Sequence, residues 1–292
     1  PLPFFLAEIM ASNIGGTATL IGEPPNIMIG SAAGLSFADF VMVDAPAAII
    51  CLIVMIGLFY LLFGRKFKVD EEHKRALMER DEREEIKNPT LLRQSVIMII
   101  LVTAGFMLHG SLGIESCVVA LTAAGILMLI SGERIEEALA HVEWTTLVFF
   151  AGLFIVVGAL SEVGVIGMLA QALIDVTGGS TFVAMLVLLI ASAIISSFLD
   201  NIPFVATMIP ILLSMEATGM DVMPLWWAVS LGACLGGNGT LIGASANVVM
   251  SDIAKKHGTE ITFIGFLKYG FPIMLVTIAV SAVYLVVRFP PM

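Results

Sequence analysis

Two short stretches of the chain carry glycine, asparagine and hydroxyl side chains at matching positions. The first runs from Gly15 to Ile27 and the second from Gly236 to Val248, and at a constant offset of 221 residues seven of the 13 positions are identical. Glycine weakens a helix interior and proline, present as a pair in the first stretch, breaks it. Both stretches are therefore predicted to interrupt a helix, which frees backbone groups that can bind an ion or a small polar molecule.

The candidate binding residues are the polar, glycine and proline positions of these stretches. Those in or beside the first are Asn13, Gly15, Gly16, Thr17, Thr19, Gly22, Glu23, Pro24, Pro25 and Asn26, and those in the second are Gly236, Gly237, Asn238, Gly239, Thr240, Ser245 and Asn247. Helix packing is the alternative interpretation, because glycines spaced by four, as at positions 30 and 34, 232 and 236, and 239 and 243, let membrane helices approach closely. Packing alone does not require asparagine or a proline pair, so binding is the preferred interpretation.

Three acidic side chains lie in or beside interrupted apolar segments. They are Glu8, Glu23 and Asp200, and an ionisable residue inside an apolar segment is a functional candidate by default. Glu8 and Glu23 align with Val229 and Ala244 in the second copy, so the repeated fold does not itself require acids there. We therefore predict that Glu23, Asp200 and Glu8 couple to a proton or cation. A structural role at a helix end is the alternative for Glu23.

A third candidate element is the turn Asp200-Asn201-Ile202-Pro203, which separates the apolar runs 181–199 and 204–214. Asp200 can cap the returning helix and Pro203 can stand at its start. The two runs are predicted to form a re-entrant hairpin with Asp200, Asn201 and Pro203 at the binding site.

Two further residues receive structural interpretations. Asp44, beside Pro46, is interpreted as a helix cap at the membrane interface, and Cys234 as a small packing residue. The chain contains neither a His-Glu-x-x-His nor a Gly-x-Ser-x-Gly motif, and its three cysteines are far apart. We therefore expect no enzyme activity, no catalytic residue, no metal site and no cofactor, other than H⁺ or Na⁺ as a coupling ion.

The composition indicates the environment in which these elements must fold. Of 292 residues, 59% are apolar and 13% are charged, with a mean hydropathy of +1.02; soluble domains have about 25% charged residues. Residues 65–93 hold nine of the 14 basic and eight of the 24 acidic residues, so the remainder cannot form a water-exposed surface. The chain is predicted to be a multi-pass membrane protein in contact with the lipid bilayer. It has no basic patch for nucleic acid.

The apolar pattern predicts an all-α fold. The segments 3–33 and 224–254 are predicted to be interrupted spans, and 162–178 an amphipathic surface helix. The uninterrupted segments long enough to cross the hydrocarbon are 42–63, 95–112, 115–131, 144–161 and 264–287.

Charge distribution predicts orientation and domain organisation. The nine basic residues place loop 65–94 in the cytoplasm, and its oppositely charged residues at i and i+4 predict a solvated helix. Alternation along the chain then makes the two interrupted spans cross in opposite directions. Residues 1–64 are predicted to be the C-terminal end of a first inverted repeat, 65–94 a linker, and 95–292 the second repeat. The N-terminal part of the first repeat is expected to lie outside this chain.

The chain resembles the ion transporter superfamily, specifically its arsenite permease, NhaD sodium–proton antiporter and P-protein group, which includes citrate transporter-like proteins. The residues that carry the resemblance are Ala11–Asn26, Glu143-Trp144-Thr145-Thr146-Leu147 with Phe149-Phe150, the turn Asp200–Pro203, and Leu231–Asn247. Together they span essentially the whole chain. Relatives often have Asp or Thr at the position of Glu23.

The resemblance implies an all-α polytopic membrane protein with an inverted repeat, broken helices and a re-entrant hairpin. It further implies a homodimer in the plasma membrane whose transport part moves like an elevator. The expected function is a secondary-active permease of the arsenite or anion type, coupled to H⁺ or Na⁺. A Na⁺/H⁺ antiporter is the alternative, and a passive ion channel is the alternative from another class.

Overall fold

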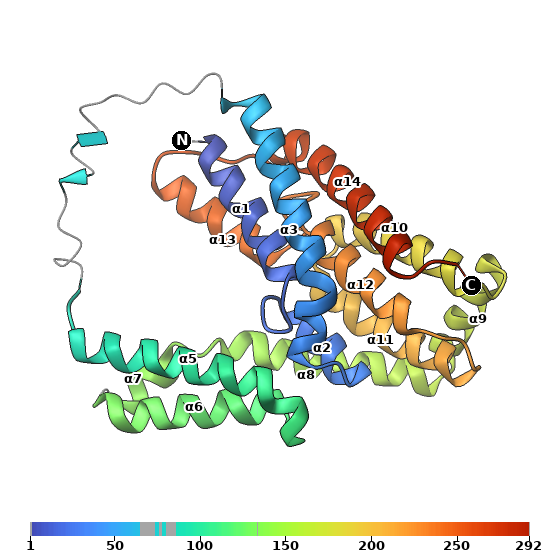
Figure 1. Ribbon diagram of the computed structural model, residues 1–292, viewed down its shortest axis with the longest axis horizontal. Helices are drawn as coiled ribbons and strands as arrows, with labels where there is room; N and C mark the ends of the chain where they lie inside the picture. Colours follow the sequence, from blue (N-terminus) through green and yellow to red (C-terminus); the bar gives the residue numbers. More distant parts are fainter. Residues whose placement is uncertain (1, 65–73, 76–77, 80–85, 133, 292) are drawn as a thin grey trace. The chain divides into compact units, whose positions relative to one another are not determined.

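The computed structural model describes residues 2–64, 74–75, 78–79, 86–132 and 134–291, and the regular secondary structure in these ranges is helical (Figure 1). The predicted ion pairs of the solvated helix, Asp70/Lys74, Glu71/Arg75 and Glu79/Arg83, each include one residue outside these ranges. The helices are α1 (Leu2–Thr17), α2 (Pro24–Ala33), α3 (Phe37–Leu62), α5 (Pro89–Leu112), α6 (Ser116–Ser131), α7 (Ile135–Ala140), α8 (Trp144–Glu162), α9 (Val165–Thr177), α10 (Thr181–Phe198), α11 (Asn201–Ala217), α12 (Met223–Gly236), α13 (Ser245–Lys256) and α14 (Phe263–Arg288).

Within the described residues, five helices are long and apolar enough to cross a membrane: α3, α5, α8, α10 and α14. The uninterrupted apolar segments of the sequence are all helices, although α6 has only 16 residues and falls short of the roughly 20 that a full crossing needs. The predicted surface helix 162–178 corresponds to α9. The all-α, multi-pass membrane fold is thereby confirmed.

The chain divides into two compact units. One comprises residues 63–147, in which α5 and α6 pack closely: a Cβ on Gly105 would lie 2.7 Å from a methyl carbon of Val119. The other comprises residues 1–62 and 148–292 and contains both interrupted segments. The candidate site belongs entirely to this second unit.

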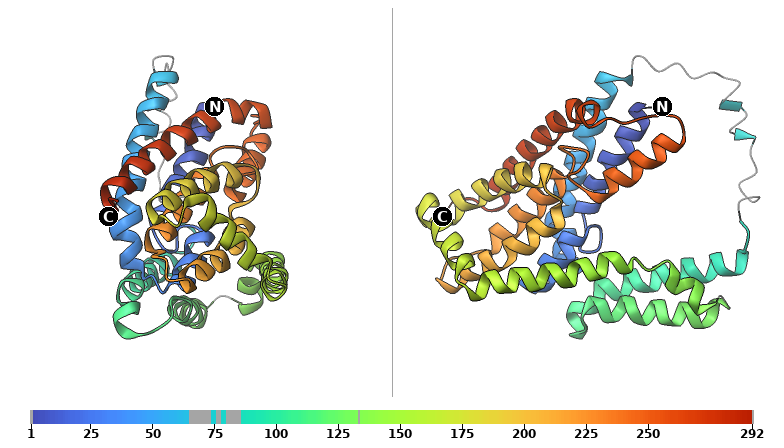
Figure 2. Two further views of the ribbon diagram at one scale, coloured as in Figure 1. Left: turned by 90° about the vertical axis from the view of Figure 1, so that its right-hand side faces the viewer. Right: turned by 180° about the vertical axis from the view of Figure 1, so that it is seen from behind.

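Helix α12 forms the core of the larger unit. Every residue from Pro224 to Gly236 is buried, as expected for a helix that is apolar all round. It runs beside α10 in the views of Figures 1 and 2. A Cβ on Gly236 would lie 2.7 Å from the Ala193 carbonyl oxygen, and one on Gly232 would lie 2.7 Å from that of Leu189. The glycine spacing in α12 therefore does serve helix packing.

Both glycine stretches interrupt a helix, as predicted. Helix α1 ends at Thr17 and α2 begins at Pro24, while α12 ends at Gly236 and α13 begins at Ser245. The proline pair occupies the first positions of α2, where the missing amide hydrogens cost nothing. We call the connections 18–23 and 237–244 the first break and the second break. The turn between α10 and α11 consists of Leu199 and Asp200.

Candidate functional site

The two breaks and the start of α11 meet around a small cavity of about 150 Å³. One water occupies about 30 Å³ of liquid, so this space accommodates a small ion with a few waters. The lining residues are Ser12, Asn13, Gly22, Glu23, Pro24, Asn201, Ile202, Ala244, Ser245 and Ala246. Six of them were predicted from the sequence: Asn13, Gly22, Glu23, Pro24, Asn201 and Ser245.

Asn13 joins the first interrupted helix to the second break. Its buried side-chain amide donates to the Oδ1 atoms of Asn238 (2.9 Å) and Asn247 (2.8 Å). Asn238 in turn donates to the carbonyl of Met10 (3.4 Å). Buried amides need such partners because an unpaired one costs free energy, so these contacts hold the two interrupted helices together at the cavity.

The two breaks close on themselves in the same way. Asn26 Nδ2 donates to the carbonyl oxygens of Gly16 (3.5 Å), Thr17 (3.1 Å) and Thr19 (3.0 Å). Asn247 Nδ2 donates to those of Gly237 (2.7 Å) and Thr240 (2.9 Å). At the offset of 221 residues, Asn26, Gly16 and Thr19 align with Asn247, Gly237 and Thr240. The repeated residues therefore build the same local structure twice.

One glycine in each break permits its tight closure. A Cβ on Gly22 would lie 2.1 Å from the Gly16 carbonyl oxygen, and a Cβ on Gly243 would lie 2.8 Å from that of Gly237. Both distances are shorter than a real Cβ contact. Glycine at these positions is thus required by backbone approach.

Asp200 of the α10–α11 turn and Asn201 at the start of α11 connect this hairpin to the first break and to α13. Asn201 Nδ2 donates to Glu23 Oε2 (2.7 Å), and Asp200 accepts from the backbone amide of Ile202 (3.0 Å) and from Ser245 Oγ (3.1 Å). Asp200 is therefore the predicted N-cap of α11. Glu23 is only 9% exposed.

Three helix N-termini converge on the cavity, those of α2, α11 and α13. A helix N-terminus carries partial positive charge and favours an anion nearby. The N-cap residues are Glu23 for α2, Asp200 for α11 and Ala244 for α13; of these three, Asp200 makes a side-chain cap hydrogen bond and the other two do not. Within the described part of the chain, neither carboxyl group has a salt bridge.

Glu8 lies apart from this cavity. Its exposed side chain lines a second cavity of about 290 Å³. Ser12 and Ala246 line both cavities. Glu8 as a coupling residue stays a prediction.

The remaining predicted residues surround the cavity without lining it. The Thr240 hydroxyl donates to the carbonyl of Ser197, and a Cβ on Gly239 would lie 2.1 Å from Ser197 Oγ, so both hold the second break against α10. The others outside the lining are Gly15, Gly16, Thr17, Thr19, Pro25, Asn26, Asp200, Pro203, Gly236, Gly237, Asn238 and Asn247. Of the lining residues that sequence reasoning missed, Ser12 stands next to Asn13, whereas Ile202, Ala244 and Ala246 are apolar and gave no chemical signal.

Asp44 is not a helix cap at the membrane interface, and that interpretation is wrong. Helix α3 begins at Phe37 and continues through Pro46, so Asp44 lies inside it and is fully buried. Its Oδ2 atom is 2.5 Å from Ser230 Oγ. Cys234 does more than fill space, because its thiol donates to Asn26 Oδ1 (3.3 Å).

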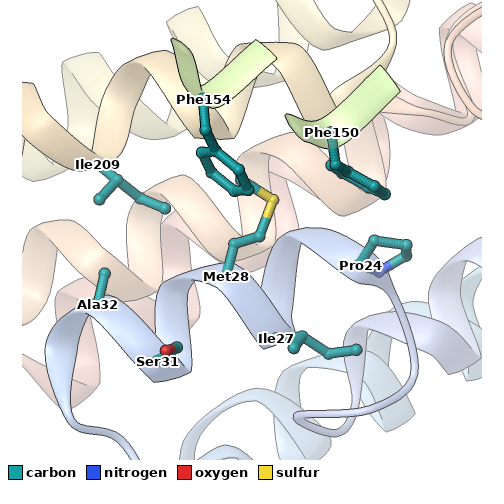
Figure 3. A pocket seen from close by; sticks show the side chains of 8 residues that line it. All are labelled: Pro24, Ile27, Met28, Ser31, Ala32, Phe150, Phe154 and Ile209. Carbon is teal, nitrogen blue, oxygen red and sulfur yellow. The ribbon is translucent and has the colours of Figure 1, made fainter. Parts of the chain in front are cut away.

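A larger pocket of about 480 Å³ lies beside the site and differs from it in chemistry. It is formed by α2, α8 and α11, and Figure 3 shows Met28 reaching toward Phe154 within it. Ser31 is its one lining residue with a polar side chain. A pocket of this composition offers a single hydroxyl group and no charged side chain to an ion, so the smaller cavity is the candidate ion site.

Comparison with known proteins assigns the chain to a family. The family model described as "Citrate transporter" matches residues 1–232. A "46 kDa membrane protein" of Mycobacterium leprae is 44% identical over 290 residues, which are 98% of this chain and 68% of that protein. An "uncharacterized transporter" of Mycobacterium tuberculosis is 45% identical over 290 residues, covering 98% of this chain and 67% of the relative.

A more distant relative is the mouse "P protein", which is 32% identical over 370 residues, covering 98% of this chain and 44% of the relative. The resemblance drawn from the glycine stretches is thus confirmed at the level of the family. The chain spans about two thirds of the length of the mycobacterial relatives. It belongs to the citrate transporter family, and it is a multi-pass membrane transport protein rather than an enzyme.

Proposed function

We propose that this protein is a secondary-active transporter that moves a small ion or anion coupled to H⁺ or Na⁺, and that the cavity of about 150 Å³ is its binding site. One observation carries the proposal. Two broken helices and the start of α11 converge on a small cavity lined by Glu23, with Asp200 beside it, and neither carboxyl group has a salt bridge in the described part of the chain.

The first break supplies groups suited to a cation or proton. A carboxylate buried without a charged partner is costly, and a bound Na⁺ or H⁺ would neutralise it. Glu23 offers carboxylate oxygens, and Asn13 adds an amide at the same cavity. We assign the coupling ion to Glu23, with Asp200 as the second carboxyl group near the same cavity.

The second break supplies groups suited to an anion. The N-terminus of α13 lacks a side-chain cap, and the Ser245 hydroxyl stands at its first position. Partial positive charge there can bind an oxyanion or carboxylate. The description of the family model makes citrate one candidate cargo, whereas the size of the cavity favours a smaller oxyanion such as arsenite.

We further propose that the two interrupted segments cross the plasma membrane in opposite orientations, with residues 65–94 in the cytoplasm. The equivalent hydrogen bonds of Asn26 and Asn247 support the internal repeat behind this proposal. Alternating access by an elevator motion of a homodimer is the corresponding mechanism. A repeat of this kind at a midplane site is typical of secondary transporters.

A Na⁺/H⁺ antiporter is the second candidate, and the composition of the cavity favours it. The lining contains Glu23 and no basic side chain, which would suit cations as the sole cargo. Exchange of Na⁺ for H⁺ without any anion requirement would identify this activity. Ion currents without dependence on a coupling ion would instead identify a passive channel.

The decisive experiment measures arsenite, citrate and Na⁺ flux side by side in proteoliposomes that contain the full-length protein, with imposed proton or Na⁺ gradients. We expect one cargo to be transported and its gradient dependence to be lost in the double variant Glu23→Gln/Asp200→Asn. Glu216→Gln is the matched control, because Glu216 is exposed on α11 and does not line the cavity. Flux and coupling unchanged in the double variant would refute the site.

A further inference from the structure

A third carboxyl group, that of Asp44, lies outside the lining of the cavity. Asp44 is fully buried in α3, and its Oδ1 atom has no hydrogen-bond partner. Its Oδ2 atom contacts Ser230 Oγ of α12 at 2.5 Å. Ser230 also contacts Asn26 Oδ1 at 2.8 Å. Asp44 is thus two hydrogen bonds from the residue that closes the first break.

The orientation of the Asn26 amide is fixed by its neighbours. Its nitrogen faces the carbonyl oxygens of Gly16, Thr17 and Thr19, which can only accept hydrogen bonds. Its oxygen must therefore face Ser230 and the Cys234 thiol. Asn26 Oδ1 is an acceptor and needs a hydrogen from each contact.

The Ser230 hydroxyl has too few hydrogens to donate to both of its acceptor contacts. The Ser230 hydroxyl has a single hydrogen, and Asn26 Oδ1 and Asp44 Oδ2 are both within reach of it. If Ser230 donates to Asn26, its contact with Asp44 requires a hydrogen on the carboxyl group. The distance of 2.5 Å is at the short end of the range for O–H···O hydrogen bonds.

We propose that Asp44 is a proton-binding site separate from the ion cavity, whose proton is donated to Ser230 Oγ while Ser230 donates to Asn26. In this arrangement both contacts of Ser230 are hydrogen bonds. The inference rests on hydrogen-bond geometry and goes beyond the proposed transport activity.

Among the residues that the structure describes, the surroundings of Asp44 offer no cation to stabilise its anion. The helices packed against α3 are α1, α12 and α14. The ionisable groups that interact with Asp44 are the Cys234 thiol from α12 and the Tyr284 phenol from α14, which donates to the Val43 carbonyl (2.7 Å). On α14, Arg288 interacts with Tyr284, and Glu8 of α1 is exposed. An unpaired buried anion is costly, so the neutral carboxyl group fits this site.

Binding and release of this proton would change the first break. When the proton passes to water, the Ser230 hydrogen is drawn to the Asp44 carboxylate and Asn26 loses a donor. Asn26 holds three carbonyls around the loop that ends at Glu23. The protonation state of Asp44 would thereby affect the ion cavity through the hydrogen bonds of two side chains, Ser230 and Asn26.

Infrared spectroscopy of the purified full-length protein tests the proposal, because a neutral carboxyl group has a C=O stretching band distinct from those of a carboxylate. We expect Asp44→Asn to lose one such band, since the amide keeps the size of the side chain and can still donate to Ser230. Asp252→Asn, on the exposed surface of α13, is the control and should leave the band unchanged.

Ser230→Ala provides a second measurement that does not require the Asp44 variant to fold. Removing the hydroxyl acceptor should shift the C=O band of Asp44 to higher frequency, as expected for a weaker hydrogen bond. A spectrum of Asp44→Asn identical to that of the unaltered protein in the neutral-carboxyl region would overturn the proposal. An unshifted band in Ser230→Ala would do the same.

Discussion

The first and second breaks share a backbone and differ in what they present to the cavity. In both, an asparagine closes the loop onto carbonyl oxygens and a glycine permits the close approach. The N-cap residue has nearly the same backbone angles, φ −141° and ψ 148° at Glu23 and φ −151° and ψ 146° at Ala244. The side chain there is a carboxyl group in one copy and a methyl group in the other. Shared residues build the loops, and the unshared residue supplies the chemistry.

The two breaks also differ in what supports them from outside. The second is held against α10, where Thr240 donates to the Ser197 carbonyl and Ser197 donates to that of Gly236 (2.9 Å). The first is reached by the side chains of Ser230 and Cys234, which both contact Asn26. Against α10 the second break is therefore held through backbone acceptors, whereas the contacts of Ser230 and Cys234 with the first break are made to a side-chain oxygen.

The largest loss of stability is expected from substitutions of the two glycines that have no room for a side chain, Gly22 and Gly243. Gly22→Ala should destabilise the protein by about 3 kcal/mol, the upper end for overpacking, because its Cβ would lie 2.1 Å from a carbonyl oxygen. Gly243→Ala, at 2.8 Å, should cost somewhat less. Thermal unfolding of the purified variants measures both. Gly57→Ala, which adds a methyl group in open space on α3, is the control. Equal stability of all three variants would contradict the requirement for glycine at both breaks.

The loop-closing asparagines should give the next largest effect. Asn26→Ala leaves three buried or partly buried carbonyl oxygens and the donors of Ser230 and Cys234 without this partner, and Asn247→Ala leaves two carbonyl oxygens and Asn13. Loss of buried partners costs about 1–3 kcal/mol per group, tempered by relaxation. We expect each variant to lose about 2 kcal/mol, with Asn26→Ala the more damaging, as measured by the unfolding midpoint in denaturant. The reverse order would show that the second break depends more strongly on its asparagine.

The carboxyl group at the first break should affect binding more than stability. Glu23→Gln keeps an acceptor for Asn201 but removes the charge, so we expect the apparent affinity for the coupling ion to fall at least about tenfold, which is 1.4 kcal/mol. The unfolding midpoint should change little. Isothermal titration with Na⁺ and flux at varied proton gradients measure the loss. Ala244→Val, which changes the N-cap of the second break without a charge, is the comparison variant, and an equal loss there would contradict the assignment of the coupling ion.

The smallest effect is expected at the exposed contact between the turn and the second break. Ser245→Ala removes one hydrogen bond to Asp200 (3.1 Å), which should cost about 0.5–1 kcal/mol of stability. The backbone amide of Ile202 still donates its hydrogen bond to the Asp200 side chain, so α11 keeps its N-cap. If Ser245 also binds the anion, this variant should weaken anion transport more than it weakens the fold. A parallel loss in both would assign Ser245 a structural role alone.

The sequence predicted the helices, both breaks and the capping role of Asp200, because glycine, proline and apolar run length are local signals. The offset of 221 residues also anticipated that Asn26 and Asn247 are equivalent. The sequence alone did not distinguish the residues that line the cavity from those that close the loops, because that distinction depends on how the two breaks pack together. Asp44 was misinterpreted because Pro46 suggested a helix end, while its partner Ser230 lies 186 residues away. The opposite orientation of the repeats and the domain boundaries stay predictions.

The amide of Asn13 has a mechanical consequence. Its hydrogen bonds link α1 to Asn238 and Asn247 of the other interrupted segment. Moving these elements apart would therefore deprive three buried amide groups of a hydrogen-bond partner at once. Motions that leave these two bonds intact avoid that cost. We therefore expect α1 and the second interrupted helix to move together, so that any change in the exposure of a bound ion involves both helices at once.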